Sequence, residues 1–170
     1  MRPKTVKKPE SLPEDVAWKL QRADGFMDLR MPGRARAELD AIPPPHRESA
    51  PYRMLVLRLA MEEQRWADAA GLARGLRDSQ PDDPGHWVQW AYAVRRAENI
   101  ESARGILTEA RGRFPKVAVI PYNLACYACQ LGDLATAREC LQQAFKLGPH
   151  YRQLALEDSD LEPLWRELGG

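Results

Sequence analysis

The sequence predicts an all-α protein, an α-solenoid of four 34-residue helix-turn-helix repeats followed by a C-terminal capping helix. Alanines recur at this spacing, and they are Ala35, Ala69, Ala103 and Ala137. Prolines recur with the same period, at Pro81, Pro115 and Pro149. Between these positions, apolar residues follow the three-to-four-residue spacing of amphipathic helices. A fixed period of this length is typical of a solenoid built from stacked helix pairs.

We expect residues 1–11 to form a flexible basic tail, because four basic residues and two prolines leave almost no apolar side chain to bury. Residues 12–170 are expected to form a single domain. Its predicted parts are repeats at about 16–49, 50–83, 84–117 and 118–151, followed by the cap at 152–170.

In the first repeat, Ser11 and Glu14 have the spacing of a capping box, so we expect a helix to begin there. Pro32-Gly33 is expected to end that helix, and a short second helix should follow, lined by Ala35, Leu39 and Ile42. The run from Pro43 to Pro45 must stop the second helix, because proline lacks the amide donor that a helix needs.

In the later repeats, the expected helix starts coincide with residues that favour the N-cap position. These residues are Ser49, Asp83, Asn99 and Asp133. The last repeat has a turn at Gly132-Asp133, and its second helix should stop at Gly148-Pro149.

These repeats resemble the tetratricopeptide repeat (TPR). The third has Trp87-x2-Trp90-Ala91-x2-Val94, then Ala103-x3-Leu107, then Pro115. The fourth has Leu124-Ala125-x2-Ala128, then Ala137-x3-Leu141, then Pro149. The small residues allow the helices of a pair to approach closely, and the large residue fills the space beside them. Repeat 2 departs from the pattern, with Leu57 at the small position and Ala73 at the large one.

After Tyr151 the period ends. The segments YNLACYACQLGD and LEDSDLEPLW resemble the end-of-array segment of many bacterial TPR proteins, which implies a cap on a bacterial interaction module. The apolar residues expected to cover the last repeat helix are Leu154, Leu156, Leu161, Leu164, Trp165 and Leu168. The charged residues expected to point to water are Asp158, Asp160, Glu162 and Arg166.

The bulk composition excludes several classes of partner. A net charge of +1 gives no general attraction to nucleic acid or to an anionic membrane. The longest uncharged run, residues 117–132, is too short to span a bilayer. The basic N-terminus lacks the apolar stretch of a secretory signal, and three cysteines cannot form a complete disulfide framework, so we expect a cytoplasmic protein.

The sequence predicts no enzyme, no cofactor and no metal site. Cys126-x2-Cys129 supplies two of the four ligands that structural zinc needs, and it lies within a predicted helix, so both residues are expected to be free, buried thiols. No histidine lies near a nucleophile with an orienting acid. Trp66, Trp87 and Trp90 occupy positions that bury between repeat helices, so we do not expect them to stack on nucleobases.

The TPR resemblance implies a concave surface that binds a peptide or helix of a partner protein. The residues expected to line this groove are Met54, Arg58, Met61, Val88, Tyr92, Arg95, Arg96, Tyr122, Asn123 and Cys126. Only Asn123 fits the carboxylate clamp of chaperone-tail receptors. Methionine, tyrosine and arginine together favour an unknown partner segment that mixes apolar anchors with acidic residues.

Two alternatives remain open at this stage. The groove residues could pack neighbouring repeats, with Arg58 and Arg95 paired to Glu62 and Glu98. The chain could also be a self-assembling structural subunit, a homo-oligomer that forms through its groove or its cap. For the oligomeric state we expect a monomer or a weak homo-oligomer.

Overall fold

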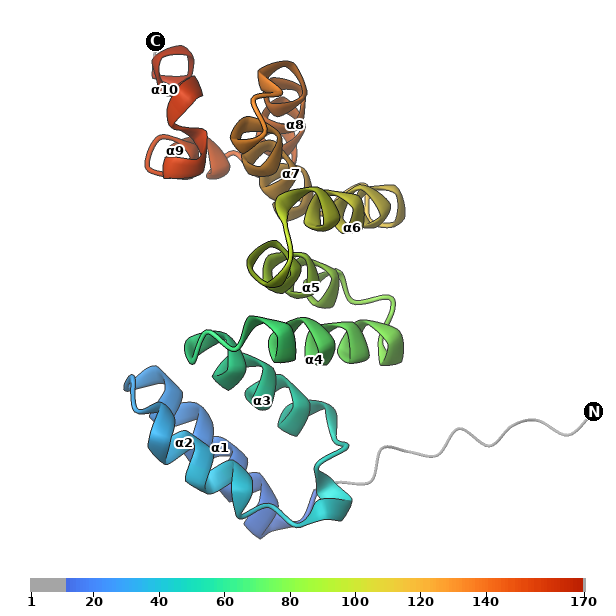
Figure 1. Cartoon of the computed structure of the whole chain (residues 1–170), viewed down its shortest axis with the longest axis vertical. Helices are drawn as coiled ribbons and strands as arrows, with labels where there is room; N and C mark the ends of the chain where they lie inside the picture. Colours follow the sequence, from blue (N-terminus) through green and yellow to red (C-terminus); the bar gives the residue numbers. More distant parts are fainter. Residues whose placement is uncertain (1–11, 170) are drawn as a thin grey trace, which may run out of the picture. The chain divides into compact units, whose positions relative to one another are not determined.

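The computed structural model describes residues 12–169, which form helices and no strand (Figure 1). They divide into two compact units. Unit 1 ends at Gln64 and unit 2 begins at Arg65. The predicted basic tail, residues 1–11, lies outside the described residues.

From residue 12 onward, unit 1 holds three α-helices and one short 3₁₀ helix. They are α1 (Glu14–Asp28), α2 (Pro32–Asp40), η1 (Pro44–His46) and α3 (Ala50–Glu62). Pro13 is the N-cap of α1, so the predicted capping box is wrong in naming Ser11, itself outside the described residues, as the N-cap. In α3, Ser49 is the N-cap, as predicted.

The turn between α1 and α2 differs from the expectation. Pro32 is the first residue of α2, where its missing amide donor costs nothing, so Pro32-Gly33 starts the second helix and does not break the first. The chain reverses two residues earlier, at Arg30, which has a φ of 57°. A left-handed residue is a frequent helix ending, although glycine is the usual choice.

The core of unit 1 forms where one face of α1 packs on α2 and α3. Its buried residues are Val16, Leu20, Ala23, Met27, Ala35, Leu39, Ile42, Leu55 and Leu59. This apolar face agrees with the helical periodicity of the sequence. Trp18 lies on another face of α1 and is 58% exposed.

Unit 2, described as far as residue 169, holds five long helices and three short ones. The long helices are α4 (Trp66–Ser79), α5 (Pro84–Ala97), α6 (Ile100–Arg113), α7 (Val119–Gln130) and α8 (Leu134–Leu147). The short ones are α9 (Tyr151–Ala155), the 3₁₀ helix η2 (Ser159–Leu164) and α10 (Trp165–Leu168). Each long helix packs on the next along the chain, as in a helical repeat.

Three predicted N-caps of unit 2 are confirmed by side-chain hydrogen bonds. Asp83 accepts from the amide of Gly85, Asn99 from Ser102 and Asp133 from Thr136. Each bond satisfies a backbone donor that the first turn of a helix leaves without a partner. The turn before Asp133 uses Gly132, with a φ of 77°.

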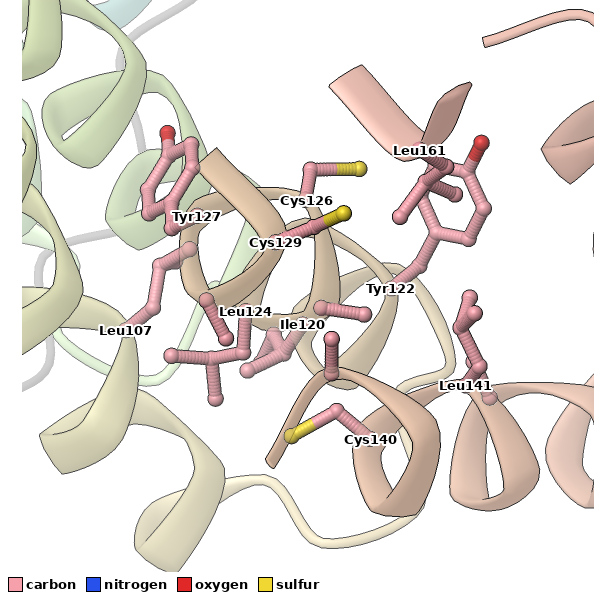
Figure 2. Packing of buried hydrophobic residues seen from close by; sticks show 14 of the residues in the cluster. Leu107, Ile120, Tyr122, Leu124, Cys126, Tyr127, Cys129, Cys140, Leu141 and Leu161 are labelled. Atoms are coloured by element: carbon pink, nitrogen blue, oxygen red, sulfur yellow. The ribbon is translucent and has the colours of Figure 1, made fainter. Parts of the chain in front are cut away.

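The core of unit 2 is built around α7, whose residues are buried on nearly every face. Figure 2 shows Leu107 and Tyr127 on one side of this helix and Leu141 and Leu161 on another. Ala91, Ala103, Ala125 and Ala137, the small repeat positions, are fully buried. Trp87 is also buried, as predicted, whereas Trp66 and Trp90 are only partly covered.

The C-terminal cap packs on α7 as well as on α8. Leu161 and Leu164 of η2 are completely buried in the same core as α7. Leu154 stays 46% exposed, so the prediction that it covers the last repeat helix is wrong. The cap is therefore an irregular segment laid against the last repeat.

Candidate interaction surface

The predicted groove residues fall into separate groups in the two units. Unit 1 carries Arg58 on α3 with Met54 and Met61, whose side chains are both half-buried. In unit 2, α5 carries Val88, Tyr92, Arg95 and Arg96, and α7 carries Tyr122, Asn123 and Cys126.

In unit 1, Arg58 forms ion pairs with two acidic residues of α1. Its guanidinium lies 2.6 Å from the carboxylate of Asp24 and also pairs with Asp28. Asp24 and Arg58 occupy the same position of successive repeats, 34 residues apart. All three side chains are more than 40% exposed, so this pair joins neighbouring first helices at the surface.

In unit 2, Arg95 binds the C-terminal cap. Both terminal nitrogens of its guanidinium donate to the carboxylate of Asp160 on η2, and one of these hydrogen bonds has a length of 3.0 Å. The guanidinium also lies 5.1 Å from the ring centre of Tyr127 on α7. The hydrogen bonds to Asp160 raise the pKa of Arg95, and only 21% of the Arg95 side chain is exposed. Such a planar, two-point contact fixes the position of a carboxylate.

Beside this ion pair, two side chains of α7 donate to Asp158. The hydroxyl of Tyr122 lies 2.8 Å from Asp158 Oδ2, and the thiol of Cys126 lies 3.5 Å from the same oxygen. Two effects raise the pKa of Tyr122: burial is the larger, and the hydrogen bond to Asp158 is the second. Burial, followed by the negative charge of Asp158, raises the pKa of Cys126. Both groups therefore stay protonated and able to donate.

The predicted orientation of these acids is wrong. Asp158 and Asp160 were expected to point to water, yet they face α5 and α7 and are half-buried. The sequence places six charged residues from position 157 to position 167, and periodicity alone does not show which of them turn inward. The pairing of Arg58 and Arg95 with Glu62 and Glu98, which belonged to one of the two open alternatives, is also wrong.

Two other α5 residues, Tyr92 and Arg96, form an open patch with Trp66 of α4. Arg96 lies 5.5 Å from the ring centres of both Trp66 and Tyr92, and those two rings meet edge to face at 5.9 Å. Arg96 is exposed, and no carboxylate of the described residues forms an ion pair with it. We call Trp66, Tyr92 and Arg96 the aromatic-arginine patch. Sequence analysis missed Trp66 here because the repeat pattern assigned it to the core.

Asn123 does not reach this patch. Its amide donates to the carbonyl of Val119, one turn earlier on α7, so the side chain is held against its own helix.

The cysteines are free and buried, as predicted. Among the described residues, the ligand atoms of Cys126, Asp158 and Asp160 all lie within 4.8 Å of one another. Asp160 already pairs with Arg95, and the raised pKa of Cys126 keeps its thiol protonated. The three groups thus have hydrogen-bonding partners of their own.

A groove of about 650 Å³ lies between residues of α4, α5 and α6 of unit 2, and half of its lining residues are small. Its lining residues are Ala67, Ala70, Gly71, Arg74, Trp90, Val94, Ala97, Glu98, Ser102, Gly105, Ile106 and Glu109. The carboxylates of Glu98 and Glu109 are present, but no histidine of the described residues joins them there.

No family model matches the chain, and no curated protein sequence matches it. In the described part, no helix combines the length and apolar character needed to cross a membrane.

Solved structures do share the fold. MamA 41-end from Desulfovibrio magneticus RS-1 matches with a TM-score of 0.70 at 14% identity, over 81% of this chain and 78% of that one. The MamA RS-1 ArsTM double mutant matches with a TM-score of 0.64 at 15% identity, over 82% and 79%. MamA has the TPR fold. The predicted fold is confirmed: the chain is an all-α helical repeat of the TPR type.

Proposed function

We propose that this chain is a non-catalytic protein-interaction scaffold and that its aromatic-arginine patch binds a short acidic segment of a partner protein. The observation that carries the proposal is Arg96, an exposed cation that lies against the rings of Trp66 and Tyr92 and has no carboxylate partner among the described residues. The TPR fold of the similar structures supports a scaffold of this kind.

The patch matches what such a segment presents. A guanidinium forms a planar fork that fits a carboxylate, and the aromatic rings offer rigid apolar area at low entropic cost. The rings also hold the Arg96 side chain in place before the partner arrives, which reduces the ordering cost of binding.

The internal contact of Arg95 supports the same chemistry. One residue earlier on α5, Arg95 already binds a carboxylate while lying over a tyrosine ring. Arg96 repeats the arrangement of cation and aromatic ring without the acid. We therefore expect the partner to supply that acid, next to an apolar side chain.

To test this, displayed random peptides would be selected on the full chain, and the enriched sequences measured by fluorescence anisotropy. We expect enrichment of Asp or Glu beside an apolar residue. Arg96→Ala should weaken binding at least about tenfold, since a charge-assisted hydrogen bond contributes about 1.5–3 kcal/mol.

Arg74→Ala is the matched control. Arg74 is an exposed arginine of unit 2 that lies outside the patch, in the groove between α4 and α6. Its removal should leave the peptide affinity unchanged. Equal losses in the two variants, or selected peptides without acidic residues, would contradict the proposal.

A further inference from the structure

We propose that the inner face of α5 and α7 is a recognition site for acidic segments of the form Asp-x-Asp-Leu, and that residues 156–164 are its resident, exchangeable ligand. A partner segment of the same chemistry takes the place of the resident one. This rests on the proposed function only in taking the partner to be a protein segment, because its site is a different one.

The contacts between the face and the segment are those of a ligand in a site. Asp160 sits in the two-point contact of Arg95, and Asp158 accepts from Tyr122 and Cys126. The side-chain amide of Gln130 donates to the backbone carbonyl of Asp160 at a distance of 3.1 Å. Side chains of two helices, α5 and α7, thus bind two carboxylates and one peptide group.

The spacing of the two acids is fixed by the segment itself. Asp158 Oδ1 accepts a hydrogen bond of 3.0 Å from the backbone amide of Asp160. This bond makes Asp158 the N-cap of the short η2 helix. This turn brings the carboxylate of Asp158 to α7 and the carboxylate of Asp160 to Arg95 of α5. The next residue, Leu161, is buried in the core. Two acids separated by one residue and followed by leucine are therefore what the face selects.

The segment has little structure of its own. η2 has six residues and contains Pro163, and α10 has four residues. Short 3₁₀ helices are unstable alone, because few hydrogen bonds offset the entropy of ordering them. Residues 156–164 are held by the face that they cover, so an equivalent segment can replace them without a loss of core contacts.

Because residues 156–164 are covalently linked to the face that they cover, they compete strongly with any free peptide. A linked segment acts as a ligand at millimolar effective concentration, so a free peptide binds the wild-type chain only weakly. Replacing the carboxylates of the resident segment should weaken its contact with the face. Arg95, Tyr122 and Cys126 would then be free to bind another acidic segment.

The test uses a fluorescent peptide with the sequence of residues 156–165, LEDSDLEPLW, and the full chain. Fluorescence anisotropy should show weak binding to the wild type and at least about tenfold tighter binding to the Asp158→Asn/Asp160→Asn variant, because the tether no longer competes. Adding Arg95→Ala to that variant should reverse the gain.

Glu167→Gln is the matched control. Glu167 of α10 makes a two-point ion pair with Arg138 of α8, away from the inner face, so this variant loses a similar contact of the cap. We expect its peptide affinity to equal that of the wild type. Arg96→Ala introduced into both the wild type and the double variant should leave the difference of about tenfold between them in place, which separates a failure here from a failure of the aromatic-arginine patch.

Equal peptide affinity in wild type and in a folded Asp158→Asn/Asp160→Asn variant would overturn the proposal. Should the double variant not fold, hydrogen exchange of the wild type decides. Millimolar peptide should accelerate amide exchange in residues 156–164 as they are displaced, and unchanged exchange would overturn the proposal equally.

Discussion

Arg58 in unit 1 and Arg95 in unit 2 show two uses of an arginine on a first repeat helix. Arg58 bridges Asp24 and Asp28 on the preceding first helix, and all three side chains are largely in water. Arg95 holds Asp160 of the cap against Tyr127, in a contact that water reaches much less.

The difference teaches that the same face of a repeat helix can join neighbouring repeats or hold an aperiodic segment of the chain, depending on what covers it. Exposed ion pairs contribute little to stability, because water screens them and both side chains lose freedom. A partly buried two-point pair costs more to break, because a charge is left without a partner. Only the second arrangement resembles an occupied binding site.

The largest expected effect concerns the segment that covers unit 2. Leu161→Ala should lower the free energy of unfolding by about 2–5 kcal/mol, because its completely buried side chain would leave a cavity. Leu154→Ala should change it by less than about 0.5 kcal/mol, because that leucine is mostly exposed. Urea denaturation measures both. Similar losses for the two leucines would mean that the cap does not pack as described.

An intermediate effect should appear at alkaline pH. Burial raises the pKa of Tyr127 from its ordinary 10.0 to about 12. The unfolded chain therefore ionises first, so this contribution is fully present below pH 10 and is lost as the pH rises through 12. Between about pH 9 and pH 11 the loss should reach about 1–2 kcal/mol.

Tyr127→Phe keeps the ring beneath Arg95 and removes the ionisable group. Urea denaturation of this variant should show a smaller decrease in stability over the same pH range. An unchanged pH dependence would show that Tyr127 ionises as readily in the folded chain as in the unfolded one.

The smallest effect is expected for unit 1. Arg58→Ala should lower the free energy of unfolding by about 0.2–1 kcal/mol, and salt should reduce the difference further, because the pair is exposed. Denaturation at low and high salt measures this. A loss as large as that of Leu161→Ala would remove the contrast between the two arginines.

The fold could be predicted from the sequence because a 34-residue period repeats the same packing problem several times. Small residues such as Ala91 and Ala125 had to be buried where helices approach closely, and they are. The N-caps Asp83, Asn99 and Asp133 followed from local chemistry alone.

The site could be predicted only in part. Periodicity places Arg95, Tyr122 and Cys126 on one inner face. The segment that covers them has no period, so the sequence alone does not show that Asp158 and Asp160 turn inward. Trp66 was assigned to the core because its repeat position is buried in other TPR units. Contacts between an aperiodic segment and a periodic one depend on tertiary structure that spacing does not encode.

The most direct test of the account is a double-mutant cycle of Arg95→Ala and Asp160→Ala, followed by urea denaturation. We predict a coupling free energy between about 0.5 and 3 kcal/mol, as for residues in direct contact. The parallel cycle of Arg58→Ala and Asp24→Ala should give a smaller coupling of a few tenths, about 0.2–0.5 kcal/mol. A coupling of zero between Arg95 and Asp160 would contradict the central claim that the cap occupies the inner face of unit 2 through this pair.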